Sequence, residues 1–294
     1  MQLRFTMFVG AVLSLGCASA QAALAQPVQP GAVIFENVRI FNGTADQLSA
    51  ASNVLVVGNL IQAISSDPIA APAGTSVTRI PGGGRTLMPG LIDNHVHLTM
   101  GASSQMDLIN PKVSAETLQS RATEEARLML LRGFTAARDM GGPVFAVKRS
   151  IDQGKTLGPR IYPSGAMISQ TSGHGDSRLP NERSRRFGGA VSRGELLGAN
   201  FIADGRDEVL TATRENLRAG ASQIKVMAGG GAASAYDPLD VTQYTLDEMK
   251  AAVEAADDWG TYVTVHAYTP KSVRRRISSS TLPTTRTRMP TSSS

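Results

Sequence analysis

The stretch Leu87-Met88-Pro89-Gly90-Leu91-Ile92-Asp93-Asn94-His95-Val96-His97-Leu98 decides the fold of this chain. Its apolar beginning leads into two histidines that lie two residues apart, as alternate residues on one face of a strand do. Two imidazoles on the same face can hold one metal ion together. The spacing therefore predicts a strand over residues 91–98 that carries a metal-binding pair, His95 and His97.

Strand-like and helix-like segments alternate after this stretch. Each predicted helix is followed by a glycine, the residue that most readily adopts the left-handed conformation at a helix end. Strands joined by helices pair in parallel, so we expect an α/β fold of the (β/α)8 TIM-barrel type, truncated after about five strands. The predicted strands are 91–98, 134–138, 160–168, 223–227 and 262–268, and the predicted helices are 114–132, 144–153, 206–219 and 245–259.

Two further segments complete this organisation. Residues 26–85 predict a small β domain, because strand-like runs at 32–41 and 54–64 are followed by a connector rich in Pro and Gly, and Gly58-Asn59 marks a hairpin turn. The first part of the barrel is then expected over 86–270. Within it, residues 171–205 are too long for an ordinary connection and predict a functional loop over a site.

The N-terminal segment has the order of a signal peptide over residues 1–25. One cation, Arg4, precedes an apolar core, and small residues follow. We expect cleavage after Ala20 or Ala25, a periplasmic or secreted protein, and no membrane association after cleavage. The chain's one cysteine, Cys17, lies inside this segment, where a lipid anchor is the alternative.

Export gives a first testable prediction. The mature protein is expected to begin near Gln21 or Gln26, because the charge, the apolar core and the small residues stand in the order that signal peptidases require. Mass spectrometry of the N-terminus of the protein recovered from cell fractions measures this. An intact Met1 in the cytoplasmic fraction would contradict it.

The net charge of +5 comes from the C-terminal segment. Residues 271–294 carry six Lys and Arg and no acid, which leaves residues 1–270 with a net charge of −1. A polyanion site needs cations clustered on a folded face, so we expect no nucleic-acid partner. Ser, Thr and Arg dominate 271–294, a composition that cannot build a core. We expect either a disordered native tail there or a frameshift near 271–276.

All four histidines, His95, His97, His174 and His266, lie at or just beyond the C-terminal ends of predicted strands. In a parallel barrel these ends form the catalytic rim. Lys225 follows in the apolar run 224–227, where burying its charge is costly and a lowered pKa would leave a neutral amine able to take up carbon dioxide. A lysine that extends its ammonium to solvent at the strand end is the alternative.

Several segments resemble one known family. Residues 87–98 resemble the first-strand signature of the amidohydrolase superfamily, which agrees with a small β domain beside the barrel. Gln223-Ile224-Lys225-Val226-Met227-Ala228-Gly229-Gly230 and Val263-Thr264-Val265-His266-Ala267-Tyr268 resemble the fourth and fifth strands of its imidazolonepropionase-like branch, which includes Xaa-Pro and Xaa-Arg dipeptidases and ochratoxin-degrading hydrolases.

The resemblance implies a zinc site and its ligands. His95 and His97 would bind the buried metal, a carboxylated Lys225 would bridge two zinc ions, and His266 would bind the second. Tyr268 would suit the carboxylate of a substrate. Because residues 172–176 resemble a loop of this branch, His174 would contact the substrate or transition state; a buried structural histidine is the alternative.

The implied activity is hydrolysis of amide bonds by metal-activated water. Dipeptides or other N-acyl amino acids are the expected substrates, a cyclic amide such as an imidazolone is the alternative, and the intact parent could be an oligomer. The resemblance covers residues 31–270, and the family continues with a metal-binding histidine and a catalytic aspartate. No histidine follows His266 and no acid follows Asp258. An inactive truncated fragment that binds at most a metal through His95 and His97 is therefore the other interpretation.

Overall fold

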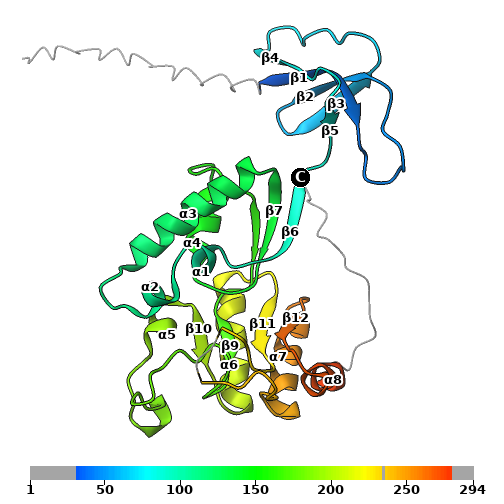
Figure 1. Ribbon diagram of the computed structural model, residues 1–294. Coiled ribbons are helices and arrows are strands. Elements are labelled where there is room, and N and C mark those ends of the chain that lie inside the picture. Colours follow the sequence, from blue (N-terminus) through cyan, green and yellow to red (C-terminus); the bar gives the residue numbers. More distant parts are fainter. Residues whose placement is uncertain (1–30, 234–235, 280–294) are drawn as a thin grey trace, which may run out of the picture. The chain divides into compact units, whose positions relative to one another are not determined.

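The computed structural model describes residues 31–279, except 234 and 235 (Figure 1). The chain divides into two compact units, Met1–Pro89 and Gly90–Ser294, so the boundary lies slightly beyond the predicted one at residue 86. The predicted signal peptide with Cys17, and residues 280–294 of the predicted tail, lie outside the described residues. No helix in the described part is both long and apolar enough to cross a membrane.

The first unit is a small β-sheet built around one long strand. The central strand pairs antiparallel with the next, and the predicted turn at Gly58 closes the hairpin to the third. Two short strands join the central strand in parallel. The strands are β1 (Ala32–Ile40), β2 (Ser52–Val57), β3 (Leu60–Ser65), β4 (Val77–Pro81) and β5 (Thr86–Leu87).

The second unit alternates strands and helices, as the sequence predicts. Its strands are β6 (Leu91–Val96), β7 (Phe134–Asp139), β8 (Arg160–Pro163), β9 (Met167–Ser169), β10 (Asn200–Ile202), β11 (Ile224–Met227) and β12 (Val263–His266). Its helices are α1 (Leu98–Gly101), α2 (Gln105–Ile109), α3 (Ala115–Leu131), α4 (Phe145–Asp152), α5 (Arg193–Leu197), α6 (Arg206–Ala219), α7 (Leu246–Asp258) and α8 (Pro270–Ser279), with a 3-10 turn at Arg185–Phe187.

Strand pairing in this unit is parallel throughout the named strands. The strands form one sheet in the order β6-β7-β8 and another in the order β10-β9-β11-β12. Apolar side chains of α6 and α7 pack with those of β11 in one core, and those of α3 and α4 pack with those of β7 in a second. In Figure 1, α3 and α4 lie beside β7, and α6 and α7 lie beside β11. The predicted α/β fold of barrel type is thus confirmed.

The predicted strand 160–168 is wrong in one respect, because it is two strands. Gly165 adopts a φ of +74°, and its carbonyl accepts a hydrogen bond from the Gly142 amide, 3.0 Å away. The chain therefore leaves the ladder with β7 after β8, and β9 pairs with β10 and β11 instead. The predicted loop 171–205 also contains α5 and β10, which its length alone did not reveal.

The predicted tail begins with a helix, which corrects the expectation of disorder directly after residue 270. α8 occupies Pro270–Ser279 and starts with a proline, whose fixed φ suits the first helical position. Thr269 and Ser272 exchange hydrogen bonds between their side chains and amides at 3.1 Å. Ser272 is buried. This local cap begins the helix in a segment with few apolar residues.

Candidate metal centre

His95 and His97 lie at the end of β6, with their ring centroids 5.3 Å apart. The strand ends at Val96, so the predicted strand 91–98 is too long by two residues. The reason is that Leu98 begins α1, and its amide donates to the buried carboxylate of Asp139. The Nδ1 atom of His97 lies 3.1 Å from the carbonyl oxygen of Gly141. The pair therefore stands at the strand end that forms the rim of a parallel barrel.

Lys225 lies on β11, the strand between β9 and β12. Its residue exposure is 2%, and burial, together with the charge of Arg138, lowers its pKa to about 8. Its own charge is among the causes that lower the pKa of every histidine in the chain: His95, His97, His174 and His266. Residues from separate strands and a loop thus converge on one buried amine.

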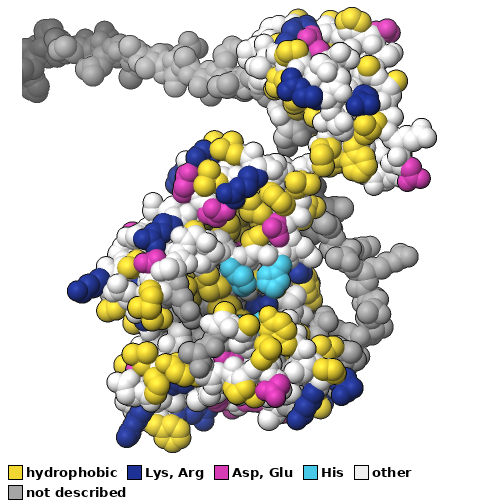
Figure 2. Space-filling view, viewed as in Figure 1, with side chains coloured by type: hydrophobic (Ala, Val, Ile, Leu, Met, Phe, Trp, Pro, Cys, Tyr) yellow, Lys and Arg dark blue, Asp and Glu magenta, His cyan; other side chains and the backbone are white. Residues whose placement is uncertain are grey.

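His266 is the last residue of β12 and pairs in register with Met227 of β11. Its ring stacks on that of His174, with centroids 4.1 Å apart and an interplanar angle of 19°. Its Nε2 atom lies 3.1 Å from the carbonyl oxygen of Gly230. Tyr268 packs edge-on against the same ring at 4.9 Å and is exposed. Figure 2 shows histidine side chains gathered at one place on this unit.

His174 is held by residues that the sequence analysis did not single out. Its amide donates to Oε1 of Gln243 at 2.9 Å, and its Nδ1 lies 3.4 Å from Oδ2 of Asp237. The side chain of Asp237 is almost completely buried. A Cβ at Gly231 would lie 2.0 Å from the imidazole, so only glycine leaves room for the ring. Because Asp237 lies in an irregular segment, no periodicity in the sequence marked it.

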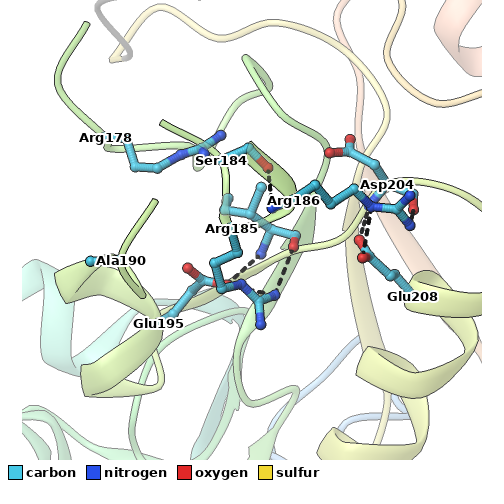
Figure 3. A pocket seen from close by; sticks show the side chains of 9 residues that line it. Arg178, Ser184, Arg185, Arg186, Ala190, Glu195, Asp204 and Glu208 are labelled. Atoms are coloured by element: carbon cyan, nitrogen blue, oxygen red, sulfur yellow. Dashed lines mark hydrogen bonds and ion pairs between the residues drawn. The ribbon is translucent and has the colours of Figure 1, made fainter. Parts of the chain in front are cut away.

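The loop that carries His174 is anchored by ion pairs. Arg178 pairs with Asp176 at 2.6 Å, Arg186 pairs with Glu208 at 2.9 Å, and Arg185 lies 3.3 Å from Glu195. Figure 3 shows three arginines with their acidic neighbours around a small cavity. The cavity holds about 10 Å³, which is room for about one water molecule. These contacts fix the loop, and this cavity between them is too small for a substrate.

A further acid, Asp139, lies beside the pair on β6 and was not predicted. Burial raises the pKa of its carboxyl to about 7, against the opposing hydrogen bonds from the amides of Leu98 and Gly141. The neighbouring Arg138 donates to the carbonyl oxygen of Asn94 at 2.7 Å and to the hydroxyl of Tyr262 at 3.1 Å. Arg138 and Asp139 are adjacent charged residues that follow the apolar residues of the strand. This pattern is the signal in the sequence that could have identified them.

The histidines at the strand ends fit a metal ion if Lys225 is a further ligand. His97 and His266 each have one ring nitrogen beside a backbone carbonyl, which leaves the other nitrogen available for coordination, as in metal-binding histidines. Within residues 31–279 as described, no three His, Cys, Asp or Glu side chains lie close enough together to hold a metal ion. A metal site here therefore needs Lys225 as a ligand, and an amine with a lowered pKa can become one.

The lowered pKa values predict the behaviour of the histidines toward acid. Burial, His174 and Lys225 lower the pKa of His266 to about 4, and the other three lie below the ordinary 6.5. The unfolded chain then binds more protons than the folded chain between pH 6.5 and 4, so acidification lowers the free energy of unfolding in that window. Titration of the imidazole protons by NMR measures this. A midpoint for His266 at or above 6.5 would contradict it.

The sequence matches known proteins in agreement with this geometry. Residues 86–283 match the sequence model described as the amidohydrolase family. The chain belongs to the amidohydrolase family.

Three relatives show where in the family its likeness lies. The ochratoxinase of Aspergillus niger is 37% identical over 201 residues, which are 66% of this chain and 40% of the ochratoxinase. A crystal structure of a prolidase complexed with N-methylphosphonate-L-proline is 33% identical with a TM-score of 0.74, over 84% of this chain and 59% of the prolidase. A Xaa-Pro dipeptidase with bound methionine is 27% identical with a TM-score of 0.68, over 85% and 60%. The chain thus spans about 40% to 60% of the length of these relatives.

Proposed function

We propose that this chain carries the metal-binding part of an amide hydrolase that cleaves dipeptides or other N-acyl amino acids. The observation that carries the proposal is the buried Lys225, whose charge acts on all four histidines at the strand ends. The likeness to a prolidase, a Xaa-Pro dipeptidase and an ochratoxinase supports the substrate class. The proposed partners are small molecules of this kind.

The proposed roles follow the positions of the side chains. His95 and His97 would hold one zinc ion, His266 a second, and a carboxylated Lys225 would join them. Zinc would supply Lewis acidity, which polarises a carbonyl and lowers the pKa of bound water towards about 7. His174, kept in orientation by Asp237, would contact the substrate or transition state, and the exposed Tyr268 would meet a carboxylate at the edge of the site.

Two other functions are alternatives to the hydrolysis of dipeptides or N-acyl amino acids. A cyclic amide of the imidazolone type needs the same metal chemistry and differs only in what the substrate loops recognise. The other is metal binding without turnover through His95 and His97, whose rings lie 5.3 Å apart at the end of β6.

One experiment on the purified chain distinguishes these functions. The chain, prepared with zinc and bicarbonate, is measured for bound metal and for hydrolysis of an Xaa-Pro dipeptide, an N-acyl phenylalanine and a cyclic imidazolone. Bound zinc with cleavage of the first two supports the proposal. Bound zinc without cleavage of any of the three supports the metal-binding alternative, and a chain that binds no zinc contradicts the proposal.

A further inference from the structure

The carboxylate of Asp139 is buried at the end of β7, and the proposed chemistry does not use it. Both of its oxygens accept hydrogen bonds from backbone amides. The amide of Leu98 donates to Oδ2 at 2.8 Å, and the amide of Gly141 donates to Oδ1 at 3.1 Å. Burying a carboxylate away from water is costly unless its oxygens accept hydrogen bonds. The two backbone amides meet this requirement for Asp139.

The two donors lie on either side of one histidine. Leu98 follows His97 directly in the chain, so the bond to its amide fixes the backbone that carries the imidazole. Gly141 offers its carbonyl oxygen to Nδ1 of His97, at 3.1 Å. One carboxylate therefore holds the amide that follows His97 and the residue whose carbonyl meets its ring.

A carbonyl oxygen can only accept a hydrogen bond, so it requires the proton of His97 on Nδ1. The lone pair then stands on Nε2, the nitrogen that a metal would meet. We infer that Asp139 is a positioning residue that sets the orientation and the tautomer of His97 for metal binding. This inference rests on the proposed metal site.

The surroundings of Asp139 make the arrangement rigid. Its carbonyl oxygen accepts from the amide of Ser164 at 2.9 Å and from Nε2 of Gln223 at 3.2 Å. Gly141 has a φ of +147°, and a Cβ there would lie 2.4 Å from the side chain of Met167. The turn from Asp139 to Gly141 therefore has little freedom to present its carbonyl elsewhere, and the hydrogen bond to His97 is preorganised.

A role as a simple cap of α1 makes a different prediction. Loss of a cap lowers the free energy of unfolding and leaves the histidine tautomer unchanged. A positioning role changes the tautomer itself. The tautomer of His97, and not the stability of the chain, therefore distinguishes a capping role of Asp139 from a positioning role.

The experiment uses the full chain, labelled with ¹⁵N-histidine and free of metal, at pH 8, where all four imidazoles are neutral. Long-range ¹H–¹⁵N spectra report which ring nitrogen of each histidine carries the proton, and His97→Gln identifies the His97 signals. The wild-type chain is expected to hold His97 with the proton on Nδ1. Asp139→Asn is expected to give a mixture of tautomers at His97, because the amide NH2 cannot accept the second backbone hydrogen bond.

Asp237→Asn is the matched control, because it removes the same charge from the partner of a different histidine. It is expected to change the signals of His174 and to leave those of His97 in place. Zinc affinity, measured by competition with a chelator, is expected to fall about 10- to 100-fold in Asp139→Asn, the range for partners that orient a ligand.

The outcomes distinguish the inference from the proposed function. A proton on Nε2 of His97 in the wild-type chain, or an Asp139→Asn chain that loses stability with an unchanged His97 spectrum, overturns the inference. If Asp139→Asn does not fold, Asp139→Ser, whose hydroxyl can still accept one backbone hydrogen bond, takes its place in the same measurement, and an unchanged His97 spectrum in that variant also overturns the inference. If the wild-type chain binds no zinc but shows the Nδ1 proton and its loss in Asp139→Asn, the orienting role stands and the proposed metal function fails.

Discussion

Lys225→Met is expected to lower the zinc affinity of this chain by at least about 100-fold and to abolish amide hydrolysis by the protein that contains it. Methionine fills a similar volume in the buried strand β11 but cannot take up carbon dioxide or bind zinc through oxygen. Without this ligand, the described residues offer no three conventional donor side chains within reach of one metal ion. Elemental analysis and chelator competition measure the loss.

The free energy of unfolding distinguishes the loss of a zinc ligand in Lys225→Met from misfolding. An apolar side chain in place of a buried cation is neutral or stabilising, so Lys225→Met is expected to unfold no more easily than the wild type. Lys155→Met, at an exposed lysine beyond α4, serves as the matched control and should keep its zinc. With ¹³C-bicarbonate, the wild type should show a carbamate carbon by NMR that Lys225→Met lacks. Full zinc binding by Lys225→Met would remove the bridging role.

His95→Ala and His174→Ala are expected to fail in different ways. His95 stands on a strand beside His97 and would bind the metal, so His95→Ala should lose zinc and with it all turnover. His174 stands on a loop anchored by ion pairs and faces Asp237, so it is suited to a substrate. His174→Ala should keep its zinc and lose turnover by about 10²- to 10³-fold, the range for one hydrogen-bond donor to a developing negative charge.

The pair of variants is its own control, because each replaces one imidazole by the same methyl group. Zinc content is read first, since it needs no knowledge of the natural substrate. Equal zinc loss in both variants would make His174 a ligand, and equal retention would remove His95 from the metal site. The stacked ring of His266 offers a second reading, because its raised pKa in His174→Ala would report the loss of a neighbouring charge.

Much of the fold could be predicted because local signals agreed. α6 (Arg206–Ala219) has the bounds that the sequence predicts, and α3 and α7 begin at side chains that cap them, Ser114 and Thr245. The sequence did not predict the break between β8 and β9, because a glycine such as Gly165 can lie inside a strand or end one. The break arises because β8 pairs with β7, whereas β9 pairs with β10 and β11.

The sequence by itself determined the alternation of strands and helices, the pair His95 and His97, and the presence of Lys225 in an apolar strand, because these depend on residue types at short spacings. Only the tertiary structure decided that Asp139 holds the amides of Leu98 and Gly141 beside His97, and that Asp237 faces His174. The contacts of Leu98 with Asp139, of His97 with Gly141 and of His174 with Asp237 join residues about 40 to 60 positions apart in the sequence. No local period in the chain records a contact of that kind, because it depends on how separate strands and loops are brought together by packing.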